Sequence, residues 1–131
     1  MCKGVDHVVI AVKDLDASVG RYETIYGSPV SDRNEAPGAG MAMAFFRFGD
    51  SYIELVSATS DQGPIAKRLS EQGEGVHLVA MKVDNMDATL TKLRDAGIRL
   101  VGDPGPGNEV KGQVFIHPSQ TGGVLTQLVE R

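Results

Sequence analysis

The stretch that decides the fold lies near the start of the chain, where residues 5–17 read VDHVVIAVKDLDA. The same pattern returns at residues 76–88, which read VHLVAMKVDNMDA and align with the first copy without a gap. In each copy an apolar run rich in β-branched residues leads into an acidic turn and then into a stretch of helical period. This order predicts a strand followed by a helix. The chain therefore contains two copies of one structural unit.

Each copy is followed by further elements in the same order. The first helix is predicted over residues 15–26, between the N-cap Asp14 and the C-terminal stop Gly27. The second helix is predicted over residues 86–96, capped by Asn85 or Asp84. The other predicted elements are a short strand with a loop (29–40), a hairpin (41–48 and 52–57), a connecting helix (64–69), a short strand (98–101) and a second hairpin (113–117 and 124–130).

This order of elements predicts a single α+β domain over residues 1–131. Two β-α-β-β-β modules, at about residues 4–58 and 75–130, are joined by a short helical connection. We expect the modules to form a cupped, barrel-like mixed sheet with the helices outside, because each helix can cover only one face of its strands.

Composition narrows the function classes. The net charge is −4, with 41% hydrophobic residues, which leaves no basic surface for nucleic acid or an anionic membrane. Cys2 is the only cysteine, so no internal disulfide can form, and no apolar run approaches the length of a membrane span. We expect a cytoplasmic protein whose partners are a small molecule and a second copy of itself.

The cup predicts a pocket at its floor. On the first strand His7 faces away from the helix side, and Tyr52 and Glu54 share one face of their strand. Aligning the repeats places Leu78 at the position of His7 and Gln127 at the position of Glu54. The side chains of His7, Glu54, Leu78 and Gln127 are then expected to converge. A buried carboxylate needs a partner or water, so Glu54 is either part of a site or on a solvated sheet face.

Six motifs are distributed along almost the whole chain: residues 5–15, YIEL (52–55), GPIAK (63–67), GEGVH (73–77), FIHP (115–118) and TGGVL (121–125). Together they resemble the vicinal oxygen chelate superfamily, and within it the methylmalonyl-CoA epimerase group. The first strand is common to glyoxalases and their relatives, whereas the closing motifs are more specific to the epimerases.

The resemblance implies a divalent metal (Co, Zn, Ni, Mn or Mg) held by His, Glu or Gln, His and Glu, one from each of four strands. His7 and Glu54 match this pattern, whereas Leu78 and Gln127 depart from it. Leucine has no lone pair to donate, and a carboxamide is a weaker ligand than a carboxylate for such ions. The remaining candidate ligands are His7, Glu54 and Gln127, so the metal site is expected to be weakened or lost. His77 reaches the site only if a bulge turns it inward.

The implied activity is epimerase- or isomerase-like: removal of an α-proton from a methylmalonyl-CoA-like thioester, with Glu54 and Gln127 as catalytic candidates. The alternatives are a metal-free, bleomycin-resistance-like binding protein and a glyoxalase-type lyase. The epimerases' Glu-Gln-Gly segment, which supplies a catalytic carboxylate, is replaced here by residues 37–40 (PGAG). The resemblance also implies a homodimer. Candidate substrate contacts are Tyr52, Leu78, Lys67, Lys111 and His117, although the lysines are equally typical of solvated surface and the His117 ring of a bond to nearby backbone.

Overall fold

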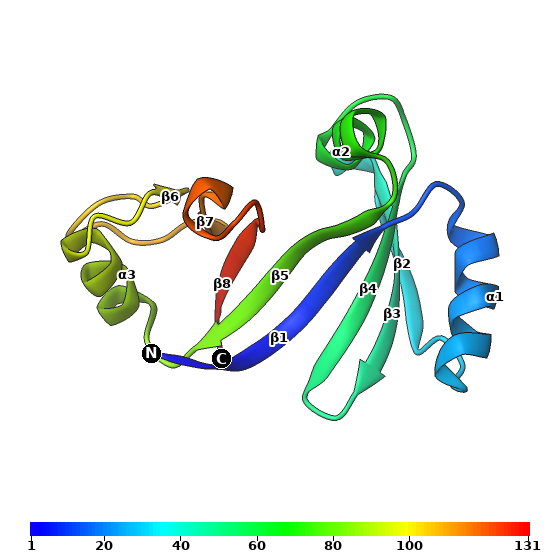
Figure 1. Cartoon of the computed structure of the whole chain (residues 1–131), viewed down its shortest axis with the longest axis horizontal. Helices are drawn as coiled ribbons and strands as arrows, with labels where there is room; N and C mark the ends of the chain where they lie inside the picture. Colours follow the sequence, from blue (N-terminus) through cyan, green and yellow to red (C-terminus); the bar gives the residue numbers. More distant parts are fainter. The chain divides into compact units, whose positions relative to one another are not determined.

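The computed structural model describes all 131 residues, which form two compact units. The first unit comprises residues 7–77, and the second comprises residues 1–6 together with residues 78–131. The elements before residue 60 are β1 (Cys2–Ala11), α1 (Leu15–Tyr26), β2 (Asp32–Ala36), β3 (Met41–Phe48) and β4 (Ser51–Ala58) (Figure 1). The later elements are α2 (Pro64–Gln72), β5 (Gly75–Val83), α3 (Met86–Asp95), β6 (Leu100–Val101), β7 (Val114–Ile116) and β8 (Thr126–Glu130).

The two sets of strands pair in the same way. In the first unit the strand order is β2-β3-β4-β1, with β1 parallel to β4 and the other pairs antiparallel. In the second unit the order β6-β7-β8-β5 repeats this arrangement, with β5 parallel to β8. The predicted α+β class with mixed strand directions is confirmed.

Helix α1 forms where the sequence predicts it, with the predicted bounds and caps. The Asp14 side chain accepts a hydrogen bond from the backbone N–H of Ala17 at 3.1 Å, which satisfies one of the free donors of the first turn. Gly27 ends the helix at φ 62°, a left-handed conformation that costs glycine little.

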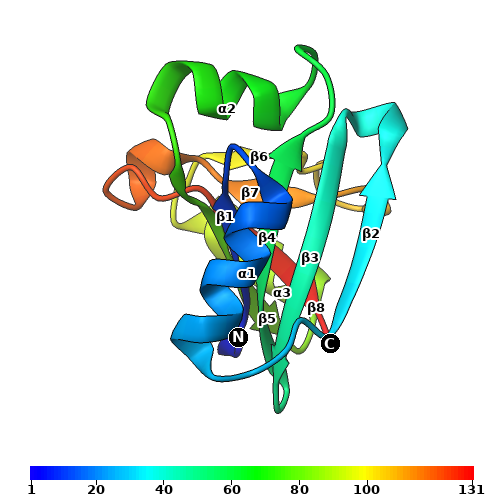
Figure 2. The ribbon, with the colours of Figure 1, turned by 90° about the vertical axis from the view of Figure 1, so that its right-hand side faces the viewer.

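One face of the first unit's strands is covered by α1, which lies beside them (Figure 2). The helix contributes Leu15 and Val19 to the core. The strands and the residue that follows β1 contribute small and large side chains that fill the remaining space, namely Val12, Ala42, Ala44, Phe46 and Leu55. The opposite face of these strands carries no part of this core, and we call it the helix-free face because α1 does not cover it.

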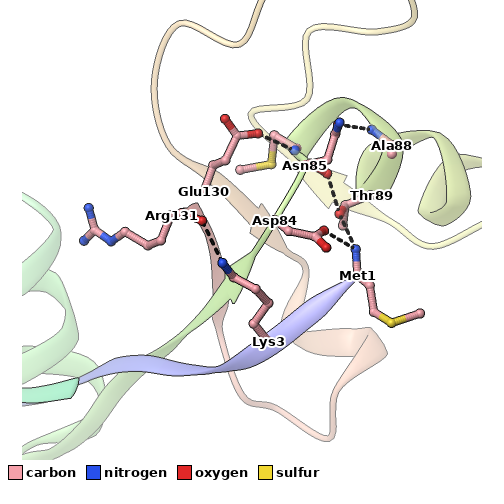
Figure 3. A network of polar contacts seen from close by, with 9 residues as sticks. Met1, Lys3, Asp84, Asn85, Ala88, Thr89, Glu130 and Arg131 are labelled. Atoms are coloured by element: carbon pink, nitrogen blue, oxygen red, sulfur yellow. Dashed lines mark hydrogen bonds and ion pairs between the residues drawn. The ribbon is translucent and has the colours of Figure 1, made fainter. Parts of the chain in front are cut away.

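The second unit is built around α3. Asn85 caps this helix by accepting a hydrogen bond from the Ala88 N–H at 2.9 Å, and Leu90 packs in a core with Val83, Val114 and Leu128. Polar contacts join the start of β1 to the rest of this unit (Figure 3). The Met1 ammonium lies 3.0 Å from an Asp84 oxygen, and the Lys3 ammonium donates to the Arg131 carbonyl at 3.0 Å.

The later strands are shorter than predicted. Only Leu100–Val101 of the predicted strand 98–101 is paired, and the last strand begins at Thr126 instead of residue 124. Between the two hairpin strands, Pro118–Gln120 forms a 3₁₀ turn. Proline has no N–H to donate to a neighbouring strand, so it does not continue β7. Conversely, the segment 29–40 is more ordered than predicted, with strand β2 and a 3₁₀ turn over Pro37–Ala39.

None of the helices is both long enough and apolar enough to cross a membrane.

Candidate functional site

The helix-free face of the first unit carries the predicted site residues of this unit. Strand alternation sends Ile53 and Leu55 of β4 toward α1 and leaves Tyr52 and Glu54 on the other face. In the parallel pairing of β1 with β4, His7 lies opposite Tyr52, and Glu54 is two residues further along β4. His7, Tyr52 and Glu54 are therefore neighbours on one surface, as the sequence predicts.

Aromatic rings and a guanidinium group stack beside Glu54. The His7 ring lies on the Tyr52 ring with centroids 4.5 Å apart and planes 9° apart. Phe45 on β3 meets the edge of Tyr52 at 5.8 Å. The Arg47 guanidinium carbon is 5.0 Å from the Tyr52 centroid and 5.1 Å from the Phe45 centroid, a cation–π arrangement. This packing holds the imidazole in a defined orientation.

Glu54 is the unusual ionisable group of this surface. Burial raises the pKa of its carboxyl to about 7, although the nearby positive charge of Arg47 acts in the opposite direction. Desolvation disfavours the charged form of a carboxyl. A group with a pKa near neutrality can both accept and release a proton at physiological pH, which is the requirement for general acid–base catalysis.

The second unit repeats this arrangement with different side chains. In the register of β5 with β8, Ala80 lies opposite Gln127, just as Val9 lies opposite Glu54 in the first unit. Phe115 of β7 lies opposite Gln127, as Phe45 lies opposite Glu54. Gln127 is thus the structural counterpart of Glu54. Counting back along the paired strands makes Leu78 the counterpart of His7.

Residues 6–115 of the chain match the family model described as the glyoxalase/bleomycin resistance protein/dioxygenase superfamily. The chain belongs to this superfamily. The resemblance inferred from the sequence motifs is thereby confirmed.

Several relatives of this chain are epimerases. The mitochondrial methylmalonyl-CoA epimerase of Homo sapiens is 32% identical over 126 residues, covering 95% of this chain and 72% of that protein. The ethylmalonyl-CoA/methylmalonyl-CoA epimerase of Cereibacter sphaeroides is 31% identical and 95% of each chain is covered. The structure of a Streptomyces coelicolor methylmalonyl-CoA epimerase variant in complex with 2-nitronate-propionyl-CoA superposes with a TM-score of 0.82, at 34% identity, and covers 99% of this chain and 98% of that one.

The side chains at the four repeat-equivalent positions do not match the ligand set that the sequence resemblance implies. They are one imidazole, one carboxylate, one carboxamide and the hydrocarbon side chain of Leu78, which is only 7% exposed. No three His, Cys, Asp or Glu side chains lie close enough together to hold a metal ion. We therefore derive no catalytic step through a metal. Because His7 and Glu54 belong to one unit and Leu78 and Gln127 to the other, their convergence stays a prediction.

The remaining candidates lie elsewhere on the two units. Lys67 is exposed on α2 of the first unit, and Lys111 is exposed in the second unit, between β6 and β7. The His117 ring accepts a hydrogen bond at Nδ1 from the Ser119 backbone N–H at 3.1 Å, as its structural interpretation predicts. His77 is half-buried, and its pKa is lowered by burial and by Arg68. Substrate contact by Lys67, Lys111 and His117 stays a prediction.

Sequence reasoning missed Phe45, Arg47 and Asp32, which adjoin Glu54 on β3 and β2. The alternation of the sequence FFRF at residues 45–48 contained the signal, because it places Phe45 and Arg47 on the face opposite Phe46. Which face Glu54 shares with them follows only from the pairing of Phe45 with Glu54.

Proposed function

We propose that this protein is an epimerase that exchanges the α-proton of a methylmalonyl-CoA-like thioester. The named relatives in the superfamily support the substrate class. The observation that carries the chemistry is Glu54, a half-buried carboxyl with a pKa of about 7 on the helix-free face.

In this proposal ionised Glu54 removes the proton from the carbon that lies between the thioester and the carboxylate. The electron pair of the broken C–H bond forms a carbon–carbon double bond with the thioester carbonyl carbon, and the π pair of the carbonyl moves onto its oxygen, which becomes an enolate oxygen. The enolate then collapses: its electron pair returns to the α-carbon, which takes a proton from a water molecule on the opposite face, and this gives the other epimer. The hydroxide left by that water is neutralised by the proton that Glu54 releases to solvent, which restores the ionised carboxylate. Gln127 has no proton that it could release at neutral pH, so we assign it no proton transfer. Its predicted catalytic role is limited in this proposal to hydrogen bonding through its amide.

The test is deuterium exchange at the α-carbon of methylmalonyl-CoA in D₂O, followed by mass spectrometry. We expect exchange to be faster with protein than without it, and Glu54→Gln to slow the catalysed rate by roughly 10²- to 10⁴-fold, the usual contribution of a general base. Glu35→Gln is the matched control, because it removes the same charge from an exposed position on β2. No enhancement by folded protein would contradict the proposal.

Leu78 supports a second candidate function, a metal-free protein that binds a small molecule without converting it. A buried hydrocarbon stands at the counterpart of His7, and Gln127 at the counterpart of Glu54. This function predicts that calorimetry detects thioester binding while the exchange assay stays at background. Catalysed exchange would exclude it.

The cofactor and the oligomeric state are further parts of the proposal. His7, Glu54 and Gln127 stay predicted metal ligands only, and metal analysis of protein purified without chelator or histidine tag tests whether the protein binds a divalent metal. The superfamily resemblance supports a homodimer, which light scattering of the purified protein tests.

A further inference from the structure

We propose that Arg47 determines the substrate specificity of the helix-free face by binding the free carboxylate of the thioester. This inference rests on the proposed function, since it names the residue that would recognise one part of that substrate. Arg47 would distinguish carboxylated thioesters from simple acyl thioesters, since both kinds carry the same CoA portion.

The guanidinium of Arg47 is held in a fixed orientation. Its Nε donates to one oxygen of Asp32 at 3.0 Å, and an Nη donates to the other oxygen at 3.3 Å. Its central carbon lies over the Phe45 and Tyr52 rings. A guanidinium carries five N–H donors, of which Asp32 accepts from two. The other three donors make no bond within the protein and are available to a ligand.

An anion can reach these donors without disturbing the core. The Arg47 side chain is 51% exposed, and its ion pair with Asp32 is at the surface. Arginine suits a carboxylate better than lysine does, because its planar guanidinium can donate to both carboxylate oxygens at once, whereas the lysine ammonium acts as a point charge. The Phe45 and Tyr52 rings already restrict the Arg47 side chain, so binding an anion costs less conformational entropy.

The position of Arg47 relative to Glu54 matches the geometry of the substrate. Arg47 lies opposite Tyr52, and Glu54 lies two residues further along β4 on the same face, a step of about 7 Å. In a methylmalonyl thioester the carboxylate is bonded directly to the carbon that loses the proton. A carboxylate held by Arg47 therefore directs that carbon toward Glu54.

The experiment measures two dissociation constants by calorimetry, one for methylmalonyl-CoA and one for propionyl-CoA, which lacks the carboxylate. The variants are Arg47→Gln and Arg47→Lys. The matched control is Arg33→Gln. Arg33 also pairs with an aspartate, Asp16 at 2.6 Å. It lies opposite Ala44 of the α1 core and is therefore on the face of the sheet away from Arg47.

We expect Arg47→Gln to weaken methylmalonyl-CoA binding by about 10- to 100-fold, the usual effect of losing a charge-assisted pair, and to change propionyl-CoA binding less than twofold. Arg47→Lys should lose part of this affinity, and Arg33→Gln should change neither constant. Circular dichroism of each variant establishes that it is folded.

Equal weakening of both ligands by Arg47→Gln would overturn the inference, because it would place a CoA phosphate or a general structural role at Arg47. Unchanged binding of both ligands would overturn it as well. If the unmodified protein catalyses α-proton exchange and Arg47→Gln gives either of these two binding results, only this inference fails. If the unmodified protein neither binds methylmalonyl-CoA nor catalyses its exchange, the proposed function fails too.

Discussion

Glu54→Gln is expected to remove a pH-dependent cost of folding. The Glu54 pKa rises from 4.5 in the unfolded chain to about 7 in the folded protein, because burial disfavours its charged form. Below pH 4.5 both states are protonated, so the carboxyl costs nothing. As the pH rises from 4.5 to 7 the unfolded chain releases the proton first, and the folded state is progressively disfavoured. Above pH 7 the full cost applies, about 3 kcal/mol from the size of the shift.

The measurement is urea unfolding of the parent protein and of the variant at half-unit steps from pH 4 to pH 8. Other carboxyls titrate equally in both proteins, so the informative quantity is the variant's free energy of unfolding minus that of the parent. We expect this difference to increase by about 3 kcal/mol between pH 4.5 and pH 7.5. The same series on Glu35→Gln provides the control for removing a charge at an exposed site.

A flat difference across this range would refute the reasoning, because it would mean that folding does not desolvate the Glu54 carboxyl. Carboxyl carbon NMR of the parent protein gives an independent answer. A titration midpoint near 4.5 for Glu54 would remove the basis for its assignment as an acid–base group at neutral pH.

The remaining predictions concern metal binding, the core and a second carboxyl. The double variant Leu78→His/Gln127→Glu should bind Co²⁺ at least about tenfold more tightly than the parent in calorimetric titration, since it supplies an imidazole and a second carboxylate; a folded double variant that binds no metal would show that these positions do not converge. Phe46→Ala should cost about 3–5 kcal/mol in urea unfolding, because Phe46 is fully buried in the α1 core, and a loss below 1 kcal/mol would contradict this packing. The pKa of Asp103 is lowered to about 2, chiefly by the hydrogen bond from Arg94, so the stability that this pair contributes should be present above pH 3.8 and lost as the pH falls through 2; Asp103→Asn should therefore unfold with a weaker dependence on acid than the parent between these pH values.

Local patterns predicted the elements of the first unit closely. Helix α1 has the predicted bounds because its caps, Asp14 and Gly27, act within a few residues of the helix ends. The β3–β4 hairpin was predicted for a similar reason, since its strands are adjacent in the sequence and a short turn at Gly49 and Asp50 joins them. The second unit was predicted less well: strand β6 has only two residues, and its length depends on pairing with β7 across a long loop.

The candidate site was predicted in part. The repeat identified Glu54 and Gln127 as counterparts, and the paired registers of the two units give the same equivalence. Arg47 and Asp32 were not found, because their relation to Glu54 depends on which residues of β2, β3 and β4 lie side by side.

The sequence by itself determined that the chain is a duplicated unit, which residues share a strand face, and where α1 begins and ends, because these properties depend on side-chain period and on neighbours a few positions away. Only the tertiary structure decided that Glu54 is desolvated enough to raise its pKa to about 7 and that Arg47 stacks on Phe45 and Tyr52. Desolvation and stacking depend on the side chains that adjacent strands bring into contact, and strand pairing joins residues that the local pattern leaves unrelated.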